Sequence, residues 1–75
     1  MESTNALITL GKSQLEKGSF HDALSSFEQA ILLDQKNPDL WNLKGIALRS
    51  LGRYNEAIDC FNKSLEIDPR DKNSS

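Results

Sequence analysis

The sequence predicts an all-α fold of four antiparallel helices arranged as two helix-turn-helix hairpins. Three observations support this prediction. Apolar residues recur at steps of three and four, paired segments of this kind meet at glycine-containing turns, and the whole pattern occurs twice in succession. Steps of three and four place apolar side chains on one face of a helix, whereas a strand facing a core on one side would alternate.

The expected helices span about residues 4–17, 20–33, 38–51 and 54–67. Asn37 and Pro38 are a start signal for the third helix, because the asparagine side chain can accept a backbone N–H and proline at the first helical position loses no hydrogen bond. Gly52 is a stop signal, since it can adopt the left-handed conformation that ends many helices. Pro69 cannot continue the last helix.

The second hairpin repeats the first without a slip in register. Gly45, Gly52, Tyr54, Ala57, Phe61 and Asp68 follow Gly11, Gly18, Phe20, Ala23, Phe27 and Asp34 at one constant interval. Glycine inside a helix costs about 1 kcal/mol relative to alanine, so Gly11 and Gly45 need a compensating role. We expect close approach of the two helices within each hairpin. The facing small residues would be Ala23, Ala30, Ala57 and Ser64, with Phe27 and Phe61 filling the space beside them.

This pattern resembles the tetratricopeptide repeat family, whose units of about 34 residues each form a helix-turn-helix. The second copy matches with Trp41, Gly45, Leu48, Tyr54, Ala57, Phe61, Ser64 and Pro69. The first is weaker, with Leu7, Gln14 and Gln35 in the places of Trp41, Leu48 and Pro69. The resemblance implies a short right-handed α-solenoid with one repeat at residues 4–37 and another at 38–71, a lead-in at 1–3 and a disordered tail at 72–75.

The resemblance also implies a concave groove, lined by the first helix of each hairpin, that binds a peptide segment of a partner protein. By register the groove comprises Asn5, Ile8, Lys12, Leu15 and Glu16 in the first repeat and Asp39, Asn42, Ile46, Arg49 and Ser50 in the second. Such a groove suits an apolar segment carrying an acidic group, and a mixed solvated face without a ligand is the alternative. The family's clamp for the acidic C-terminus of heat-shock chaperones is not expected, because Ile8, Lys12 and Leu43 occupy the corresponding places.

The end of the second hairpin carries an apolar face that the sequence does not cover. Stacked repeats bury one another's apolar faces, and terminal repeats normally have a polar outer face. Ile58, Phe61 and Leu65 repeat a pattern that a following helix would cover. Three interpretations remain: the chain is an excerpt of a longer array, the face forms a homodimer with a second copy, or Phe61 and its neighbours turn inward within their own hairpin.

Composition and net charge limit the classes of partner that we expect. The 75 residues suffice for one small domain, and a net charge of -2 with a pI near 5.2 gives no basic footprint for nucleic acid. Neither a secretory signal nor an apolar stretch of membrane-spanning length is present in this sequence. We therefore expect a cytoplasmic protein whose partner is a protein or peptide, not nucleic acid or a membrane.

No constellation in the sequence predicts catalysis, a metal site or a cofactor. His21 and Cys60 are too few for a metal site, and we expect a solvated histidine and a small cysteine filler at a helix boundary. Asp22, Glu56 and Asp59 lie near helix starts, where carboxylates favour the helix dipole. We expect a non-enzymatic adaptor that binds a partner segment, with structural self-association as the alternative.

Overall fold

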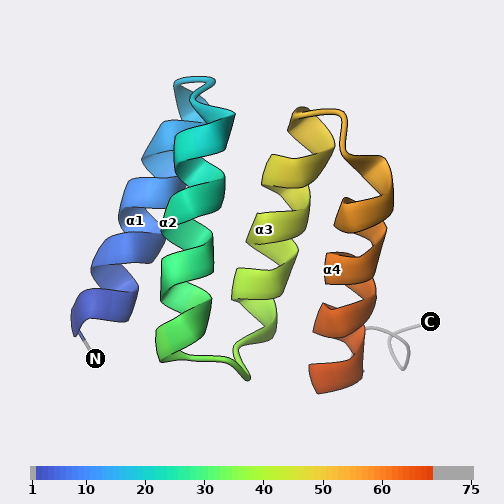
Figure 1. The fold of residues 1–75 in the computed structure, drawn as a ribbon. Helices are drawn as coiled ribbons and strands as arrows, with labels where there is room; N and C mark the ends of the chain where they lie inside the picture. The colour runs from blue at the N-terminus through green and yellow to red at the C-terminus, as the bar shows by residue number, and fades with distance from the viewer. Residues whose placement is uncertain (1, 69–75) are drawn as a thin grey trace.

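The computed structural model describes residues 2–68 and contains four helices in that range (Figure 1). They are α1 (Glu2–Glu16), α2 (Phe20–Leu33), α3 (Pro38–Ser50) and α4 (Tyr54–Ile67). The last three begin where the sequence predicted, whereas α1 begins at Glu2, ahead of the expected start near residue 4. The polar residues assigned to a lead-in thus join the helix from residue 2 onward. Met1 and the tail at 72–75 lie outside the described residues.

The helices form two antiparallel hairpins side by side, α1 with α2 and α3 with α4 (Figure 1). The hairpins meet where α3 packs on α2, with a marginal contact between α3 and α1. The shortest dimension of the molecule is 19 Å, which corresponds to about two helix diameters. Consequently α1 with α3 and α2 with α4 form two layers, each with an open outer face.

Both hairpins turn through the same hydrogen-bonded motif. Gly18 and Gly52 have φ angles of 81° and 84°, which L side chains rarely adopt. In the second hairpin the N–H of Arg53 donates to the carbonyl of Leu48 at 2.9 Å, and the N–H of Gly52 donates to the carbonyl of Arg49 at 3.0 Å. The equivalent bonds close the first turn. This pair of bonds is the Schellman motif, so the predicted stop signal at Gly52 is confirmed.

The turn between the hairpins is held by side chains. The Asn37 side chain accepts the Asp39 backbone N–H at 3.0 Å and so caps α3, with Pro38 in its first turn. The predicted start signal is therefore confirmed. In addition, the Trp41 indole N–H donates to the backbone carbonyl of Gln35 at 3.0 Å, which ties the first turn of α3 back to the connection.

The two helical glycines give each hairpin its close approach, as predicted. A Cβ built on Gly45 would lie 2.5 Å from Cε1 of Phe61, and one built on Gly11 would lie 2.7 Å from Cζ of Phe27. Each phenylalanine ring therefore packs directly on the backbone of the opposite helix. Of the small residues expected beside them, Ala23, Ala30 and Ala57 are buried and Ser64 is half-buried.

The core lies mainly between α2 and α3. Its largest fully buried side chains are Phe27, Leu40 and Leu48, and every one of them comes from these two helices. Towards α4 the burial is less complete. Phe61 is half-buried, although it packs on the core, and Ile58 is 53% exposed.

Candidate functional site

A hollow of about 560 Å³ lies between α1 and α3. It is lined by Asn5, Ile8 and Lys12 of α1, by Asp39, Asn42, Leu43 and Ile46 of α3, and by Asn37 of the preceding turn. Three of these residues are apolar and half-buried, and they form the floor. The polar residues form the rim.

The repeat itself brings these residues together. Asn5, Ile8 and Lys12 precede Asp39, Asn42 and Ile46 by exactly one repeat, so they occupy equivalent positions on two helices that run in the same direction (Figure 1). Translation of one hairpin onto the next therefore places two equivalent stripes beside each other. Six of the ten residues predicted for the groove lie in this hollow.

The other four predicted groove residues do not line the hollow. Leu15 and Glu16 end α1, and Arg49 and Ser50 end α3, so both pairs lie about one turn beyond it. Leu15 is half-buried and packs on the core, whereas Glu16, Arg49 and Ser50 are exposed. The hollow between α1 and α3 thus ends before the hairpin turns, which leaves these residues to the hairpin core or to solvent.

Sequence reasoning did not assign Asn37 and Leu43 to this site. Asn37 was interpreted only as a helix cap, and its backbone position beside α3 gives it a second role on the rim. Leu43 precedes Ile46 by three positions, which puts the two on one side of α3. That spacing is the signal that could have identified it.

The rim carries balanced charge and two amides. Lys12 supplies a positive charge and Asp39 a negative one, while Asn5 and Asn42 each offer both donors and acceptors. Such a set can hydrogen-bond an extended backbone and orient a charged side chain, and the floor can take an apolar side chain. The arrangement is suited to binding a peptide.

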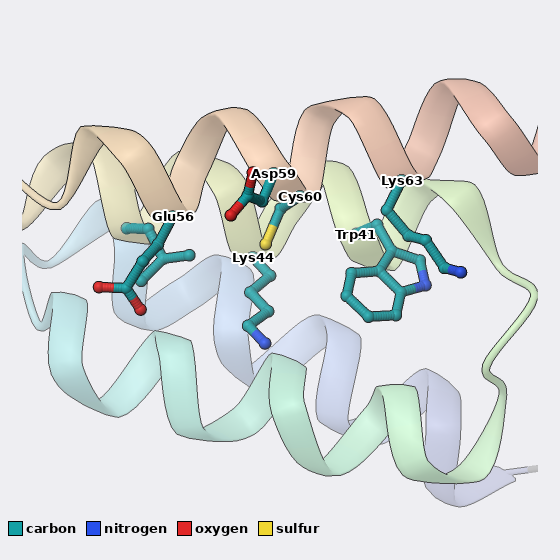
Figure 2. Close-up of a pocket in the computed structure, with 7 residues that line it drawn as sticks. Trp41, Lys44, Glu56, Asp59, Cys60 and Lys63 are labelled. Carbon is teal, nitrogen blue, oxygen red and sulfur yellow. The ribbon is translucent and has the colours of Figure 1, made fainter.

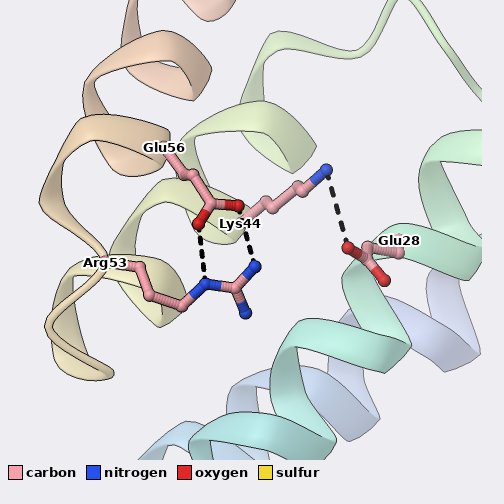
Figure 3. A network of polar contacts seen from close by, with 4 residues as sticks. All are labelled: Glu28, Lys44, Arg53 and Glu56. Carbon is pink, nitrogen blue, oxygen red and sulfur yellow. Dashed lines mark hydrogen bonds and ion pairs between the residues drawn. The ribbon is translucent and has the colours of Figure 1, made fainter.

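A polar network lies on the side of α2 and α4 (Figure 3). Arg53 donates from Nε and Nη2 to the two carboxylate oxygens of Glu56, both at 2.8 Å. These bonds lower the pKa of the Glu56 carboxyl and raise the pKa of the Arg53 guanidinium. Lys44 Nζ lies 3.7 Å from Glu28 Oε2 and thereby links α3 to α2. Glu56 is thus engaged in an ion pair at the start of α4.

The two soft-ligand candidates are not placed for such a role. His21 is exposed, as predicted. Cys60 is 5% exposed and packs in the core, as expected of a small filler. It lies in the middle of α4 and not at a helix end, and its register turns it towards α3. Burial raises the pKa of the Cys60 thiol, which keeps it protonated near neutral pH. Within residues 2–68 no group of three His, Cys, Asp or Glu side chains is placed to hold a metal ion.

In the part of the chain that the structure describes, no helix has both the length and the apolar character needed to cross a bilayer.

Comparison with known proteins gives a consistent result. Two family models, each described as Tetratricopeptide repeat, match residues 38–71 and 4–37. An uncharacterized protein of Methanocaldococcus jannaschii is 44% identical over 52 residues, which cover 69% of this chain and 60% of that protein. Superkiller protein 3 of Schizosaccharomyces pombe is 33% identical over 63 residues, covering 84% of this chain and 4% of that protein. Small glutamine-rich tetratricopeptide repeat-containing protein 2 of Mycosarcoma maydis is 36% identical over 52 residues, which cover 69% of this chain and 15% of that protein. The chain therefore spans less than two thirds of the length of each of these three relatives.

Proposed function

Because the chain belongs to the tetratricopeptide repeat family, whose repeats form protein-interaction modules, we propose that it binds an extended segment of a partner protein in the hollow between α1 and α3. The observation that carries this proposal is the alignment of equivalent positions from two repeats around one hollow. A cytoplasmic location and an adaptor role without catalysis are parts of the same proposal.

The lining residues suggest how the segment is held. Ile8, Leu43 and Ile46 favour one apolar side chain, since burying it removes apolar surface from water. The amides of Asn5 and Asn42 can pair with the segment's backbone N–H and C=O groups. Lys12 favours a carboxylate on the segment.

The test uses a peptide selected from a random display library with the wild-type protein as bait. Lys12→Glu should weaken that peptide by about tenfold in isothermal titration calorimetry, because charge reversal at a rim turns attraction into repulsion. Arg49→Glu is the matched control, since Arg49 is exposed and lies outside the hollow. Equal affinity of the peptide for both variants and the wild type would refute the proposal.

Self-association is the second candidate function, and one observation favours it. Ile58 is 53% exposed, whereas Leu24, its equivalent one repeat earlier, is 7% exposed beneath α3. Phe61 and Leu65 are half-buried, and Phe61 packs on Gly45, so Ile58 is the part of this face most available to a second copy.

Sedimentation equilibrium over a wide concentration range tests this second function. Ile58→Glu should convert a dimer into a monomer without unfolding it, because the side chain is already in water. Leu65→Glu should have the same effect on mass. A wild-type protein that stays monomeric at every concentration would retire self-association.

A further inference from the structure

We propose that a groove between α2 and α4, on the face away from the α1/α3 hollow, is a second docking site, and that its occupant is an acidic peptide segment with one large apolar side chain. Trp41 lies at the middle of this groove. The proposal concerns a different surface from the one treated above and does not depend on it.

The groove consists of two hollows of about 320 and 590 Å³ that share Trp41 and Lys63. The first contains Lys44, Glu56 and Asp59, and Figure 2 shows these side chains around the space between α4 and α2. The second extends along the C-terminal ends of α2 and α4. Its apolar lining comes from Ile31, Leu32 and Ile67 in addition to Trp41.

The tryptophan is fixed before any ligand arrives. Its indole N–H already donates to the Gln35 carbonyl at 3.0 Å, and the Nζ atoms of Lys44 and Lys63 lie 5.4 and 5.9 Å from the ring centroid. Because its N–H already has a partner, the ring offers an incoming side chain only apolar and π contacts. The Trp41 side chain is already held in place, so it loses little conformational entropy when a ligand binds. Tryptophan is among the residues that most often dominate binding energy in this way.

Leu32 adds an apolar surface that the fold leaves in water. It is 75% exposed, although a leucine of this size gains about 1.5–3 kcal/mol from full burial. Together with Ile31, Trp41 and Ile67 it makes up the apolar wall of the second hollow. A large apolar side chain of a partner would cover this wall.

Charge selects the rest of the occupant. Among the described residues, those that line the second hollow include two lysines, Lys36 and Lys63, and no carboxylate, on a chain of net charge -2. Lys63 has one ion pair there, with Glu66 at 3.9 Å, and both side chains are well exposed. Exposed pairs of this kind are weak, so Lys63 can turn to a ligand carboxylate. Carboxylates flanking the apolar side chain would complement this end of the groove.

The second repeat supplies Trp41, Lys44 and Lys63, whereas Leu32 and Lys36 come from the end of the first. The positions equivalent to Trp41, Lys44 and Lys63 in the first repeat hold Leu7, Leu10 and Gln29. The first hairpin therefore reproduces neither the ring nor the cations, which makes the groove a property of the junction between the two repeats.

The test is an NMR titration of the ¹⁵N-labelled protein with the capped peptide acetyl-Asp-Asp-Leu-Phe-Asp-Asp-amide. The chain has one tryptophan, so its indole N–H is a single resolved reporter at the centre of the groove. We expect saturable shifts of that signal and of the Leu32 and Lys36 amides. The neutral peptide with asparagine in place of each aspartate should bind about tenfold more weakly.

The matched variants are two double charge reversals. Lys36→Glu with Lys63→Glu should weaken the acidic peptide by about tenfold or more, whereas Lys17→Glu with Arg49→Glu, at exposed residues outside both hollows and the α1/α3 hollow, changes the net charge equally and should leave the affinity within about twofold. Thermal melts establish that both variants are folded. The single changes Lys36→Gln and Lys63→Gln, each expected to weaken binding by about threefold, serve if the double reversal unfolds.

Several outcomes of the peptide titrations would overturn the proposal. They are the absence of a saturable Trp41 shift up to about 5 mM peptide, shifts confined to Asn5 and Asn42, equal weakening by the two double reversals, and equal affinity for the neutral peptide. Trp41 shifts that grow with protein concentration alone would also overturn it, because they would identify a second copy of the chain as the occupant.

Discussion

Helices α2 and α4 carry the same pattern in the same register, yet they end in different surroundings. Leu24, Phe27 and Ile31 of α2 are 7%, 0% and 7% exposed. Their equivalents Ile58, Phe61 and Leu65 are 53% exposed, half-buried and half-buried. The cause is α3, which packs over α2, while no helix of the described chain packs over α4 in the same way. A repeated sequence thus determines the packing inside a hairpin, but the burial of a repeated residue depends on its neighbour.

A second contrast lies inside the hairpins. In the first, Ser26 Oγ donates to Gln14 Oε1 at 2.7 Å, and Ser26 is 4% exposed. The equivalent residues in the second hairpin are Leu48 and Cys60, which are 2% and 5% exposed. One hairpin therefore bonds two polar side chains across its helices where the other buries two apolar ones. The first hairpin thus has a polar pair of residues, and the second an apolar pair, at the same two positions of the repeat.

The largest effect that tests the comparison of α2 with α4 is loss of a phenylalanine ring. Phe27→Ala should lower the free energy of unfolding by about 3–5 kcal/mol, because the ring is fully enclosed and leaves a cavity. Phe61→Ala should cost about half as much, since solvent already reaches its ring. Urea unfolding measures both, and the milder pair Phe27→Leu and Phe61→Leu gives the same order if the first variant does not fold. Equal losses would show that α3 adds nothing to the environment of Phe27.

The helical glycines give the next largest difference. In Gly11→Ala the new methyl group would press on a Phe27 ring that α3 holds in place, so we expect a loss of about 1–3 kcal/mol. In Gly45→Ala the ring of Phe61 can move outward, and the helix gains about 1 kcal/mol from replacing glycine. We therefore expect a net change within about 1 kcal/mol for that variant. Thermal melts of the two variants should separate clearly, and identical melting temperatures would contradict this account.

The buried polar pair gives a smaller effect that a double-mutant cycle can isolate. Gln14→Leu and Ser26→Cys should each destabilise the protein by about 1–2 kcal/mol, because each deprives the other residue of its hydrogen-bond partner. The double variant copies Leu48 and Cys60 from the second hairpin and should recover most of that loss. Denaturant titration of the four proteins measures the coupling. Additive losses would mean that the two positions are independent.

The smallest expected effect concerns the starts of α2 and α4. Glu56 is paired with Arg53, whereas the residues one repeat earlier are Asp22 and Ser19 and form no such pair. The depressed pKa of Glu56 means that its folded carboxylate binds a proton less readily than the unfolded one. The ion pair therefore stabilises the protein above the ordinary glutamate pKa of about 4.3. This contribution disappears as the pH falls through the lower pKa of the folded protein.

The corresponding experiment follows the melting temperature against pH. Glu56→Gln should lower it slightly at neutral pH and have no effect once the pH is well below about 4. Asp22→Asn is the control, because it removes a first-turn carboxylate that has no arginine partner. A larger effect in the control would assign the stabilisation to the helix dipole and not to the ion pair.

Much of the fold could be predicted because its determinants are local. Gly18 and Gly52 end helices because their own backbones adopt positive φ angles, and Asn37 caps α3 with its own side chain. A glycine inside a helix, at Gly11 and Gly45, indicated that a large side chain packs closely there. These features need no knowledge of how the hairpins are oriented. The family resemblance, carried over by register, also placed Asn5, Ile8 and Lys12 beside their equivalents on α3.

The remaining features depend on that orientation. The groove around Trp41 combines Leu32 and Lys36 with Lys63, and these residues approach one another only after α2, α3 and α4 have packed. Likewise, the sequence showed Gln14 in the place of Leu48, but its hydrogen-bond partner Ser26 could be identified only by comparing both positions with Leu48 and Cys60. Exposure of Leu32 likewise depends on how α2, α3 and α4 pack together, which spacing does not encode, whereas the inward position of Cys60 follows from its register on α4.

The position of α3 has a consequence for how the molecule opens. It is the helix that packs on both α2 and α4, whereas α1 and α4 lie at the two edges (Figure 1). Fluctuations that detach an edge helix break one interface, but those that free α3, or α2 on its other side, break the contacts of both hairpins. Backbone amides in the middle of α2 and α3 should therefore exchange with deuterium most slowly, at rates set by opening of the whole molecule. The unfolding seen by Trp41 fluorescence will report that same event and not fraying at the edges.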